Sequence, residues 1–576
     1  MIKKLLSCVR EYKKPTIITL LFILGEAVIE TLIPFLTANL VTDIKYSAPM
    51  TEVLKIGAIL VLLAIISLSF GAGAGFTSAK AASGFAKNLR EDMFRKIQSY
   101  SFQNIDKFSS SSLVTRMTTD VTNVQMAYMM IIRMAVRSPL MLIFSSVMAF
   151  YMGGALAMAF VIAIPVLAFG LIMIGKYAMP AFRSVFKKYD RLNESIEENV
   201  RAMRVVKGFS REPYEKEKFG KAADDICNDF TRAERIVALN TPLMTLCMDF
   251  DLVFILLVGS KMAIADGTLD IGQISAMITY GVQILMSLMF LSFMYVMVTM
   301  SLESAKRIVE VLDEESSLHS PENAVTEIAD GSIEFQDVCF KYSEAAERYA
   351  LSDIDLRIPS GATVGVIGGT GSSKSTLVQL IPRLYDVSSG TLRVGGRDVR
   401  EYDLQALRDA VAMVLQKNLL FSGSIRENLQ WGNPAATDEE IAEACRLAQA
   451  EEFVERFPDR YDTHIEQGGS NVSGGQKQRL CIARALLKKP KILILDDSTS
   501  AVDTRTDALI RQGFREFIPD TTKIIIAQRI ASVQDADMIV VLDNGTISDV
   551  GTHDELLERS EIYREVFEQQ TNGGDE

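Results

Sequence analysis

The chain has 576 residues, of which 48% are hydrophobic and 23% are charged. This length exceeds that of a single ordinary domain, and so many apolar residues beside so many charges indicate a membrane part joined to a soluble part. The formal net charge of -12 argues against a nucleic-acid partner, because binding to nucleic acid requires a basic face.

Residues 1–14 predict an amphipathic helix that lies on the inner face of the membrane. Ile2, Leu5, Leu6 and Val9 recur at helical spacing among lysines, which is typical of interfacial helices. We expect no cleavable signal peptide, because the apolar stretch that follows is long and lacks a small-residue cleavage site.

Residues 15–302 predict an all-α transmembrane domain with six spans in contact with the lipid bilayer. About 20 apolar residues cross a bilayer as a helix, and the uncharged stretch 138–175 is long enough for two helices that turn at Gly153-Gly154. Lysines and arginines gather before the first span and after the second, so the positive-inside rule places the amino terminus, both long loops and the carboxyl-terminal half in the cytosol of a cell-membrane protein. The expected spans are 15–40, 56–76, two within 138–175, 236–260 and 271–302.

Two intervals between the spans are far longer than a turn needs. Both have amphipathic helical character, and about 25 further helical residues would reach roughly 35 to 40 Å beyond the membrane. We expect the spans to continue as cytosolic rods that turn near 109–119 and near 210–219, where Pro213 marks a break. Such tips could carry force to the soluble part, and the alternative is that these loops are mere linkers.

Residues 303–330 are polar, contain Pro321 and predict a domain linker. From 331 to 576 the pattern changes to short β-rich runs, such as 363–367 and 492–495, which alternate with helical stretches. This alternation is typical of an α/β domain with a largely parallel sheet.

A glycine-rich loop follows the run 363–367 and opens a helix. Backbone N–H groups at such a helix start can hold phosphate oxygens, Lys374 can reach the β and γ phosphates, and the Ser375 hydroxyl can bind Mg²⁺. Asp496 at the end of an apolar strand is placed to hold the same metal through water. The pattern therefore predicts bound ATP and Mg²⁺. The loop consists of Gly368, Gly369, Thr370, Gly371, Ser372, Ser373, Lys374, Ser375 and Thr376.

Further motifs stand in a fixed order around this loop: Tyr342, Gln416, Val472-Ser473-Gly474-Gly475-Gln476, Asp496-Asp497 and Ser500-Ala501-Val502-Asp503. Together they resemble the ATP-binding-cassette (ABC) transporter family, and six spans ahead of one cassette resemble an exporter-type half-transporter. The resemblance covers essentially the whole chain. It implies a six-helix transmembrane domain of the exporter type followed by an α/β nucleotide-binding domain.

The resemblance also implies a role for each motif. Tyr342 would stack on adenine, and Gln416 would sense the metal and the attacking water. The signature segment 472–476 would close over the γ phosphate of the opposite cassette, because the family's cassettes dimerise head to tail, and Asp503 would lie at that seam. Two simpler interpretations are that Tyr342 is an ordinary strand aromatic and that Ser473 only caps a helix; the glycines after Ser473 favour the signature.

Three positions depart from the family pattern. Ser373 replaces the last glycine of the phosphate loop, Asp497 replaces the glutamate that orients the attacking water, and Gln528 replaces the histidine that contacts the γ phosphate. The Asp497 carboxylate would stop roughly 1 Å short, at a place where such a misplacement can cost about 100-fold in rate. Each change could be harmless, but three in one site favour weak hydrolysis.

An intact signature beside a weak site predicts an unlike partner. A homodimer would have two weak sites, whereas a second ABC half-transporter with the consensus glutamate and histidine would complete one strong site on this chain's signature. We therefore expect an obligate heterodimer that hydrolyses ATP to export amphipathic or hydrophobic compounds, such as drugs, lipids or peptides. The alternatives are an importer of the same fold, as for siderophores, and an ATP-gated regulator or channel.

Acidic residues in the spans are candidates for the substrate cavity. Glu26 and Glu30 lie four residues apart on one helical face, where they could attract a cationic or zwitterionic substrate. Alternatively they are neutral, or paired with a base of a partner chain. Asp249 and Asp251 point to nearly opposite sides of their helix, so at most one lines the same cavity, and Asp249 is included as a candidate.

Overall fold

The computed structural model describes residues 1–576 except 265–266, 345, 498–501 and 573–576; the side chains at 183, 186, 187, 190, 194 and 572 also lie outside the description. The chain divides into two compact units. Unit 1 comprises Met1–Gln98 and Ser109–Glu314, and unit 2 comprises Ser99–Phe108 and Glu315–Glu576.

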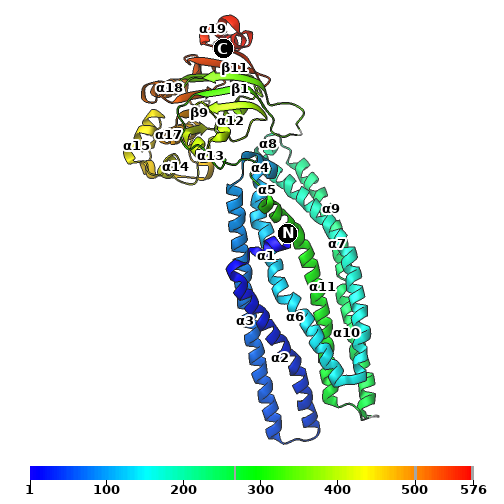
Figure 1. Ribbon diagram of the computed structural model, residues 1–576. Coiled ribbons are helices and arrows are strands. Elements are labelled where there is room, and N and C mark those ends of the chain that lie inside the picture. The colour runs from blue at the N-terminus through cyan, green and yellow to red at the C-terminus, as the bar shows by residue number, and fades with distance from the viewer. Residues whose placement is uncertain (265–266, 345, 498–501, 573–576) are drawn as a thin grey trace. The chain divides into compact units, whose positions relative to one another are not determined.

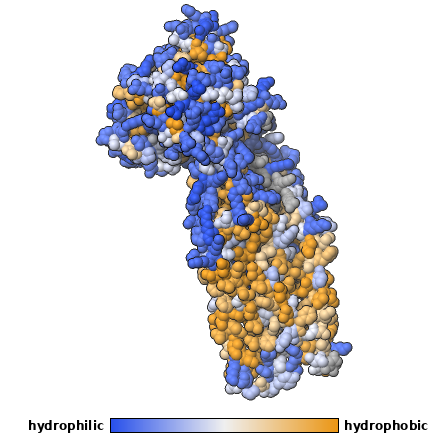
Figure 2. All heavy atoms as spheres, in the orientation of Figure 1, coloured by the Kyte–Doolittle hydropathy of each residue, from blue (hydrophilic) through white to orange (hydrophobic). Residues whose placement is uncertain are grey.

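Unit 1 is built of helices (Figure 1). They are α1 (Ile2–Ser7), α2 (Lys13–Lys45), α3 (Met50–Gln98), α5 (Ser110–Thr115), α6 (Val121–Gly153), α7 (Met158–Arg201), α8 (Met203–Gly208), α9 (Glu212–Val237), α10 (Asn240–Ile264) and α11 (Ile271–Asp313). Apolar side chains gather over the middle of these helices in Figure 2, with polar side chains toward both ends. This pattern fits a helical membrane domain.

Among the described residues, five stretches are long and apolar enough to cross a membrane. The longest, Ser110–Phe182, contains the predicted hairpin: α6 ends at Gly153, and α7 begins at Met158 and runs in the opposite direction (Figure 1). Gly154 has a φ of +50°, which glycine adopts without a side-chain clash. Two crossings in this stretch, and hence six in total, stay a prediction. The five stretches are Arg10–Lys45, Met50–Gln98, Ser110–Phe182, Glu212–Ile264 and Ile271–Asp313.

Several helices are longer than a bilayer requires, as the predicted rods demand: α3 has 49 residues, α7 has 44 and α11 has 43. The expected positions of the tips were wrong by several residues. The first turn holds the short helix α4 (Phe102–Phe108) and ends at Ser109, which caps α5. Pro213 lies in the first turn of α9, where a missing N–H costs nothing, so it starts a helix.

The ends of the membrane part also differ from expectation. The predicted helix 1–14 is divided into α1 and the 3-10 turn Arg10–Tyr12. Leu5 and Val9 are buried, whereas Ile2 and Leu6 are exposed. At the other end α11 continues to Asp313, so the first part of the predicted linker 303–330 is helical.

Unit 2 contains two main sheets. A six-stranded sheet has the order β12-β11-β3-β10-β9-β6, in which β12 is antiparallel to β11 and the other neighbours are parallel. This confirms the predicted α/β domain with a largely parallel sheet. Its strands are β3 (Thr363–Gly368), β6 (Val411–Val414), β9 (Ile492–Asp496), β10 (Thr522–Ile526), β11 (Met538–Asp543) and β12 (Thr546–Gly551).

An antiparallel sheet of order β2-β1-β4-β5 and a two-stranded pair complete the strands of unit 2 that the structure describes. They are β1 (Ile333–Phe340), β2 (Leu351–Ile358), β4 (Ser389–Val394), β5 (Arg397–Asp398), β7 (Gly423–Ser424) and β8 (His464–Ile465). The helices are α12 (Lys374–Leu380), α13 (Leu404–Ala410), α14 (Ile425–Gln430), α15 (Asp438–Leu447), α16 (Glu451–Val454), α17 (Gly474–Leu487), α18 (Thr504–Phe517), α19 (His553–Arg559) and α20 (Glu561–Asn572).

The six-stranded sheet has a hydrophobic core on each face. Alternate residues of a strand point to opposite faces: Ile492 and Ile494 belong to one core, and Leu493 and Leu495 belong to the other. All five residues of β9 are buried. A strand buried on both faces reads as a continuous apolar run, and it ends here in the acidic residue Asp496.

Candidate functional site

The nucleotide-site motifs meet at one edge of the parallel sheet. Strands β11, β3, β10, β9 and β6 are consecutive neighbours. The phosphate loop follows β3, Gln528 follows β10, and Gln416 follows β6, whereas β9 ends in Asp496, which Asp497 follows. Ligands of open α/β sheets bind at the carboxyl ends of the strands. The fold therefore assembles residues that are far apart in the sequence into one site.

Lys374 folds into the phosphate loop. Its Nζ donates hydrogen bonds to the carbonyl oxygens of Gly368 at 2.9 Å and Gly369 at 2.8 Å. Burial lowers the pKa of Lys374, and the nearby carboxylates Asp496 and Asp497 oppose that shift. The ammonium group thus lies where phosphate oxygens could replace the carbonyls as its acceptors.

Ser373 keeps a backbone conformation that suits glycine. It is the N-cap of α12, with φ 69° and ψ 26°, and its side chain makes no capping hydrogen bond. A residue with a side chain in this left-handed region carries strain of about 1 kcal/mol. The predicted departure at Ser373 therefore has a physical cost in the folded chain.

Ser375 and Asp496 fit a magnesium ion. The Ser375 Oγ donates to Asp496 Oδ1 at 3.0 Å, and both are hard oxygen ligands of the type that Mg²⁺ prefers. Burial raises the pKa of Asp496, and the hydrogen bond from Ser375 opposes this shift. No cluster of three or more His, Cys, Asp or Glu that could hold a metal occurs among the described residues, so phosphate oxygens and water would supply the other ligands.

The three predicted catalytic residues come together at Asp497. Its Oδ2 accepts hydrogen bonds from Gln528 Nε2 at 2.9 Å and from Gln416 Nε2 at 3.4 Å. Its backbone N–H donates to Ile526 at 3.0 Å, so the residue is fixed to strand β10. Two neutral amides therefore hold the short carboxylate, and an amide takes up no proton as a histidine would.

Tyr342 lies two residues beyond the end of β1 rather than within the strand. Its ring packs edge-on against Phe340 at 4.9 Å and Tyr385 at 5.3 Å between ring centroids. Its hydroxyl is 2.9 Å from Thr376 Oγ1 in the helix that the phosphate loop opens. Tyr342 as a whole residue is 44% exposed, so it remains accessible for stacking against a base.

The signature segment forms the exposed amino terminus of α17. Ser473 is the N-cap, and its side chain accepts from Gln476 N while Gln476 Oε1 accepts from Ser473 N at 2.9 Å. Ser473 therefore caps α17, and its signature role stays a prediction. Ser473 and Gly474 are exposed, and a helix start favours anions. The capped amino terminus of α17 is therefore accessible to a phosphate group.

The segment after Asp497 is described only in part. Ser500 and Ala501 lie outside the described residues, whereas Val502 is buried and Asp503 caps α18. Hydrogen bonds from the Thr506 backbone and hydroxyl lower the pKa of the exposed Asp503.

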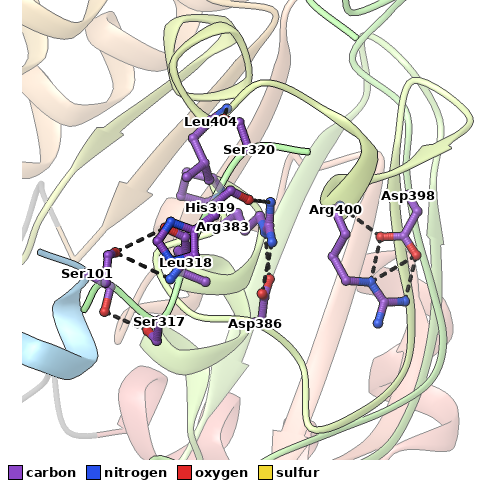
Figure 3. Close-up of polar contacts among 12 residues, drawn as sticks. Ser101, Ser317, Leu318, His319, Ser320, Arg383, Asp386, Asp398, Arg400 and Leu404 are labelled. Carbon is purple, nitrogen blue, oxygen red and sulfur yellow. Dashed lines mark hydrogen bonds and ion pairs between the residues drawn. The ribbon is translucent and has the colours of Figure 1, made fainter. Parts of the chain in front are cut away.

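Within unit 2, α4 and the chain after Glu314 are held to the cassette by polar contacts, some of which appear in Figure 3. Ser101 Oγ is 2.7 Å from Ser317 Oγ, and the Tyr385 hydroxyl donates to Asp106 Oδ2 at 2.7 Å. Tyr385 is also a packing partner of Tyr342. The first tip therefore contacts the same aromatic cluster as the nucleotide site, a connection that spacing alone does not reveal.

The candidate acids of the membrane part have different environments. Arg137 Nη2 contacts Glu30 at 2.7 Å and Glu26 at 3.5 Å, so their base comes from this chain. Glu30 and Arg137 line a cavity of about 360 Å³. Asp249 is exposed, whereas Asp251 is buried. Both line a second cavity of about 100 Å³.

The glycine-rich loop before α12, the acid at the end of β9 and the exposed start of α17 are the features expected of an ATP-binding domain in unit 2, and the helices of unit 1 are those expected of a multi-pass membrane domain. Known families match both parts. The ABC transporter transmembrane region matches residues 16–288, and the ABC transporter family matches residues 351–500.

Similar proteins cover nearly the whole chain. The ABC transporter ATP-binding protein YfiB of Bacillus subtilis is 36% identical over 568 residues, which are 99% of this chain and 98% of that protein. A fatty acid ABC transporter ATP-binding/permease protein of Mycobacterium bovis is 34% identical over 83% of this chain and 75% of that protein. This chain belongs to the ABC transporter family, whose ATP-binding domain couples ATP hydrolysis to transport.

The fold is that of an ABC exporter. The structure of a bacterial Atm1-family ABC exporter with ATP bound superposes with a TM-score of 0.84 at 22% sequence identity, and the match covers 97% of this chain and 98% of that one.

Proposed function

We propose that this chain is one half of a heterodimeric ATP-driven exporter of amphipathic or hydrophobic compounds. It lies in the cell membrane with its amino terminus and nucleotide-binding domain in the cytosol. Its own ATP site binds nucleotide but hydrolyses it weakly, and its signature completes the stronger site of the partner half-transporter.

The observation that supports a weak site is the arrangement around Asp497. The aspartate side chain is one methylene shorter than glutamate, and the amides of Gln416 and Gln528 both donate hydrogen bonds to one of its carboxylate oxygens. A general base must reach the proton that it abstracts, and the glutamine at 528 adds no titratable group. ATP binding is less affected, because Lys374 and Ser375 retain the consensus positions.

The first experiment compares the full-length chain alone with the complex that it forms with a second half-transporter. We expect slow ATP turnover by the chain alone and fast turnover by the complex. Fast turnover by a homodimer, with both sites active, would overturn the proposal.

The second experiment tests whether the signature acts on the partner's nucleotide. Ser473→Ala should reduce ATP turnover of the complex by about tenfold or more, because it removes a hydroxyl from the γ phosphate site. Thr437→Ala is the matched control, because Thr437 caps α15 in the same type of capping box with Glu440. Both variants should lose about 1 kcal/mol of stability, and equal ATP turnover in the two would mean that Ser473 is only a cap.

Amphipathic cargo is supported by a cavity of the membrane unit that charged and apolar side chains line together, and by the fatty acid named for the mycobacterial relative. Export is supported by the exporter fold. Inside-out vesicles that contain the complex should accumulate a fluorescent amphiphile when ATP is added outside. ATP-dependent loss of amphiphile from those vesicles would indicate import instead.

A further inference from the structure

The membrane helix α10 carries an acidic residue on its packed face. Its buried residues are Cys247, Asp251, Ile255 and Gly259, and their four-residue spacing makes one stripe along the helix. Asp251 is 3% exposed and lies near the middle of α10. The remaining members of the stripe are small or apolar, so a carboxyl group at this place is costly and marks a functional candidate.

The Asp251 carboxylate lacks a partner in this chain. Both of its oxygens are buried and accept no hydrogen bond from any residue that the structure describes. Glu26 and Glu30 differ, because Arg137 contacts both of them. A buried carboxylate that is not paired with a cation is strongly unfavourable, so Asp251 calls for a cation or a proton.

A cavity opens beside Asp251 between α10 and α11. Its volume is about 100 Å³, and its lining includes Met248, Asp249, Leu252 and Ile278. A water molecule takes about 30 Å³ of liquid, so the cavity has room for a small charged group with its first carbon atoms. Apart from the two aspartates, the residues that line it are apolar or glycine.

We propose that Asp251 and this cavity bind the cationic group of a lipophilic amine. The charge of the ammonium group pairs with the carboxylate, and its apolar substituents contact the methionine, leucine and isoleucine side chains. Calcium and magnesium ions suit the cavity poorly, because they require about six oxygen ligands. This proposal gives the proposed exporter a substrate class, the lipophilic amines. Binding of the amine does not depend on the proposed export function; only its transport does.

Binding to the full-length chain in lipid nanodiscs tests the site separately from transport. The probe is n-octylammonium, with octanoate and octanol as anionic and neutral compounds of equal chain length. Asp251→Asn should weaken octylammonium binding by at least about tenfold, because truncating one partner of a buried charge pair has an effect of this size. Binding of octanol and octanoate should change less than about twofold.

Two further variants separate Asp251 from its neighbours. Asp249→Asn removes an exposed carboxylate, and because exposed pairs are weak its effect should be below about fivefold. Asp224→Asn, on the exposed surface of α9, should leave binding unchanged. A loss at Asp249 equal to that at Asp251 would overturn the assignment.

A structural role for Asp251 gives different results. Asp251→Leu should be at least as heat-stable as the wild type, because it removes a buried carboxyl without a partner. A marked loss of heat stability in Asp251→Leu would mean that the carboxyl has a structural partner. Unchanged octylammonium binding in Asp251→Asn would mean that the cavity holds only water. Either result overturns the proposal. Intact binding without amine transport would instead count against the proposed export function.

Discussion

Replacing Asp497 by glutamate tests whether reach limits ATP hydrolysis. The added methylene extends the side chain by about 1.5 Å, the length of one carbon–carbon bond. This length covers the shortfall of roughly 1 Å that the comparison with glutamate predicts. A misplacement of that size costs about 100-fold in rate, or about 2.7 kcal/mol of activation free energy.

The local structure reduces the expected gain. The Asp497 carboxylate accepts from Gln528 at 2.9 Å and from Gln416 at 3.4 Å, and a longer side chain must leave or rearrange these hydrogen bonds. The φ of Asp497 is +48°, a region that aspartate tolerates better than glutamate. This strain of about 1 kcal/mol is present in both the ground state and the transition state, so it should lower heat stability rather than rate. We expect Asp497→Glu to raise turnover by about 10- to 100-fold.

The assay is release of phosphate at saturating ATP by the full-length chain alone, because any homodimer that it forms would have the sound signature and two copies of the weak site. Asp497→Asn is the matched control, and it should change turnover by less than about threefold, since a carboxylate out of reach contributes little. A large loss in Asp497→Asn would show that the aspartate already activates water and would refute the reasoning. No gain in Asp497→Glu with normal ATP binding would move the defect to Gln528, which Gln528→His in the same chain then tests.

Three further predictions concern other parts of the molecule. Ser373→Gly relieves the left-handed strain, so it should leave heat stability unchanged or raise it by up to about 1 kcal/mol, although glycine at a helix start usually destabilises. Ser373→Ala keeps the strain and should show no such gain in thermal unfolding. Because burial raises the pKa of Asp496 above its ordinary 3.8, more of the carboxyl is protonated at any given acidic pH. Magnesium-dependent ATP binding, measured with and without a chelator, should therefore weaken on acidification. This weakening should begin at a higher pH than it would if Asp496 had the pKa of an ordinary aspartate. Arg137→Met leaves Glu30 without its base and should lower the free energy of unfolding by about 2 kcal/mol, a value below that of a fully buried pair because both side chains are partly exposed. The double variant with Glu30→Gln should recover part of this loss in thermal unfolding.

Much of the nucleotide site could be predicted because its motifs follow the strands of a parallel sheet. The phosphate loop after β3 and Asp496 at the end of β9 were assigned to one ATP and Mg²⁺ site, and parallel strands do end at one edge of the sheet. Gln416 after β6 was assigned to that site by the family resemblance, because no strand at 411–414 was expected. The contacts themselves could not be predicted. Gln528 and Asp497 are 31 positions apart, and their hydrogen bond depends on β10 lying beside β9, which spacing does not determine.

The membrane part was harder to predict, because the partners of a polar residue come from distant helices. Arg137 stands next to the uncharged stretch 138–175, and nothing in the sequence pattern marks it as the base for Glu30, 107 positions away. Periodicity placed Asp249 and Asp251 on different sides of α10, and the first is exposed and the second buried, yet both line the same small cavity. It could not tell which of them is buried, because that depends on how α10 packs against α11.

The departures at Ser373 and Asp497 affect the backbone in opposite ways. Both residues have positive φ, 69° and 48°, so serine is more strained than the glycine it replaces, whereas aspartate is less strained than the glutamate it replaces. The first change costs stability without removing the lysine or the metal ligands, and the second relieves strain by shortening the base. A site built in this way is expected to hold ATP and to cleave it slowly. In a head-to-tail pair, slow cleavage on this chain would keep one nucleotide between the cassettes while the partner's site turns over, so ATP trapped by the complex after brief hydrolysis should lie at Lys374 of this chain.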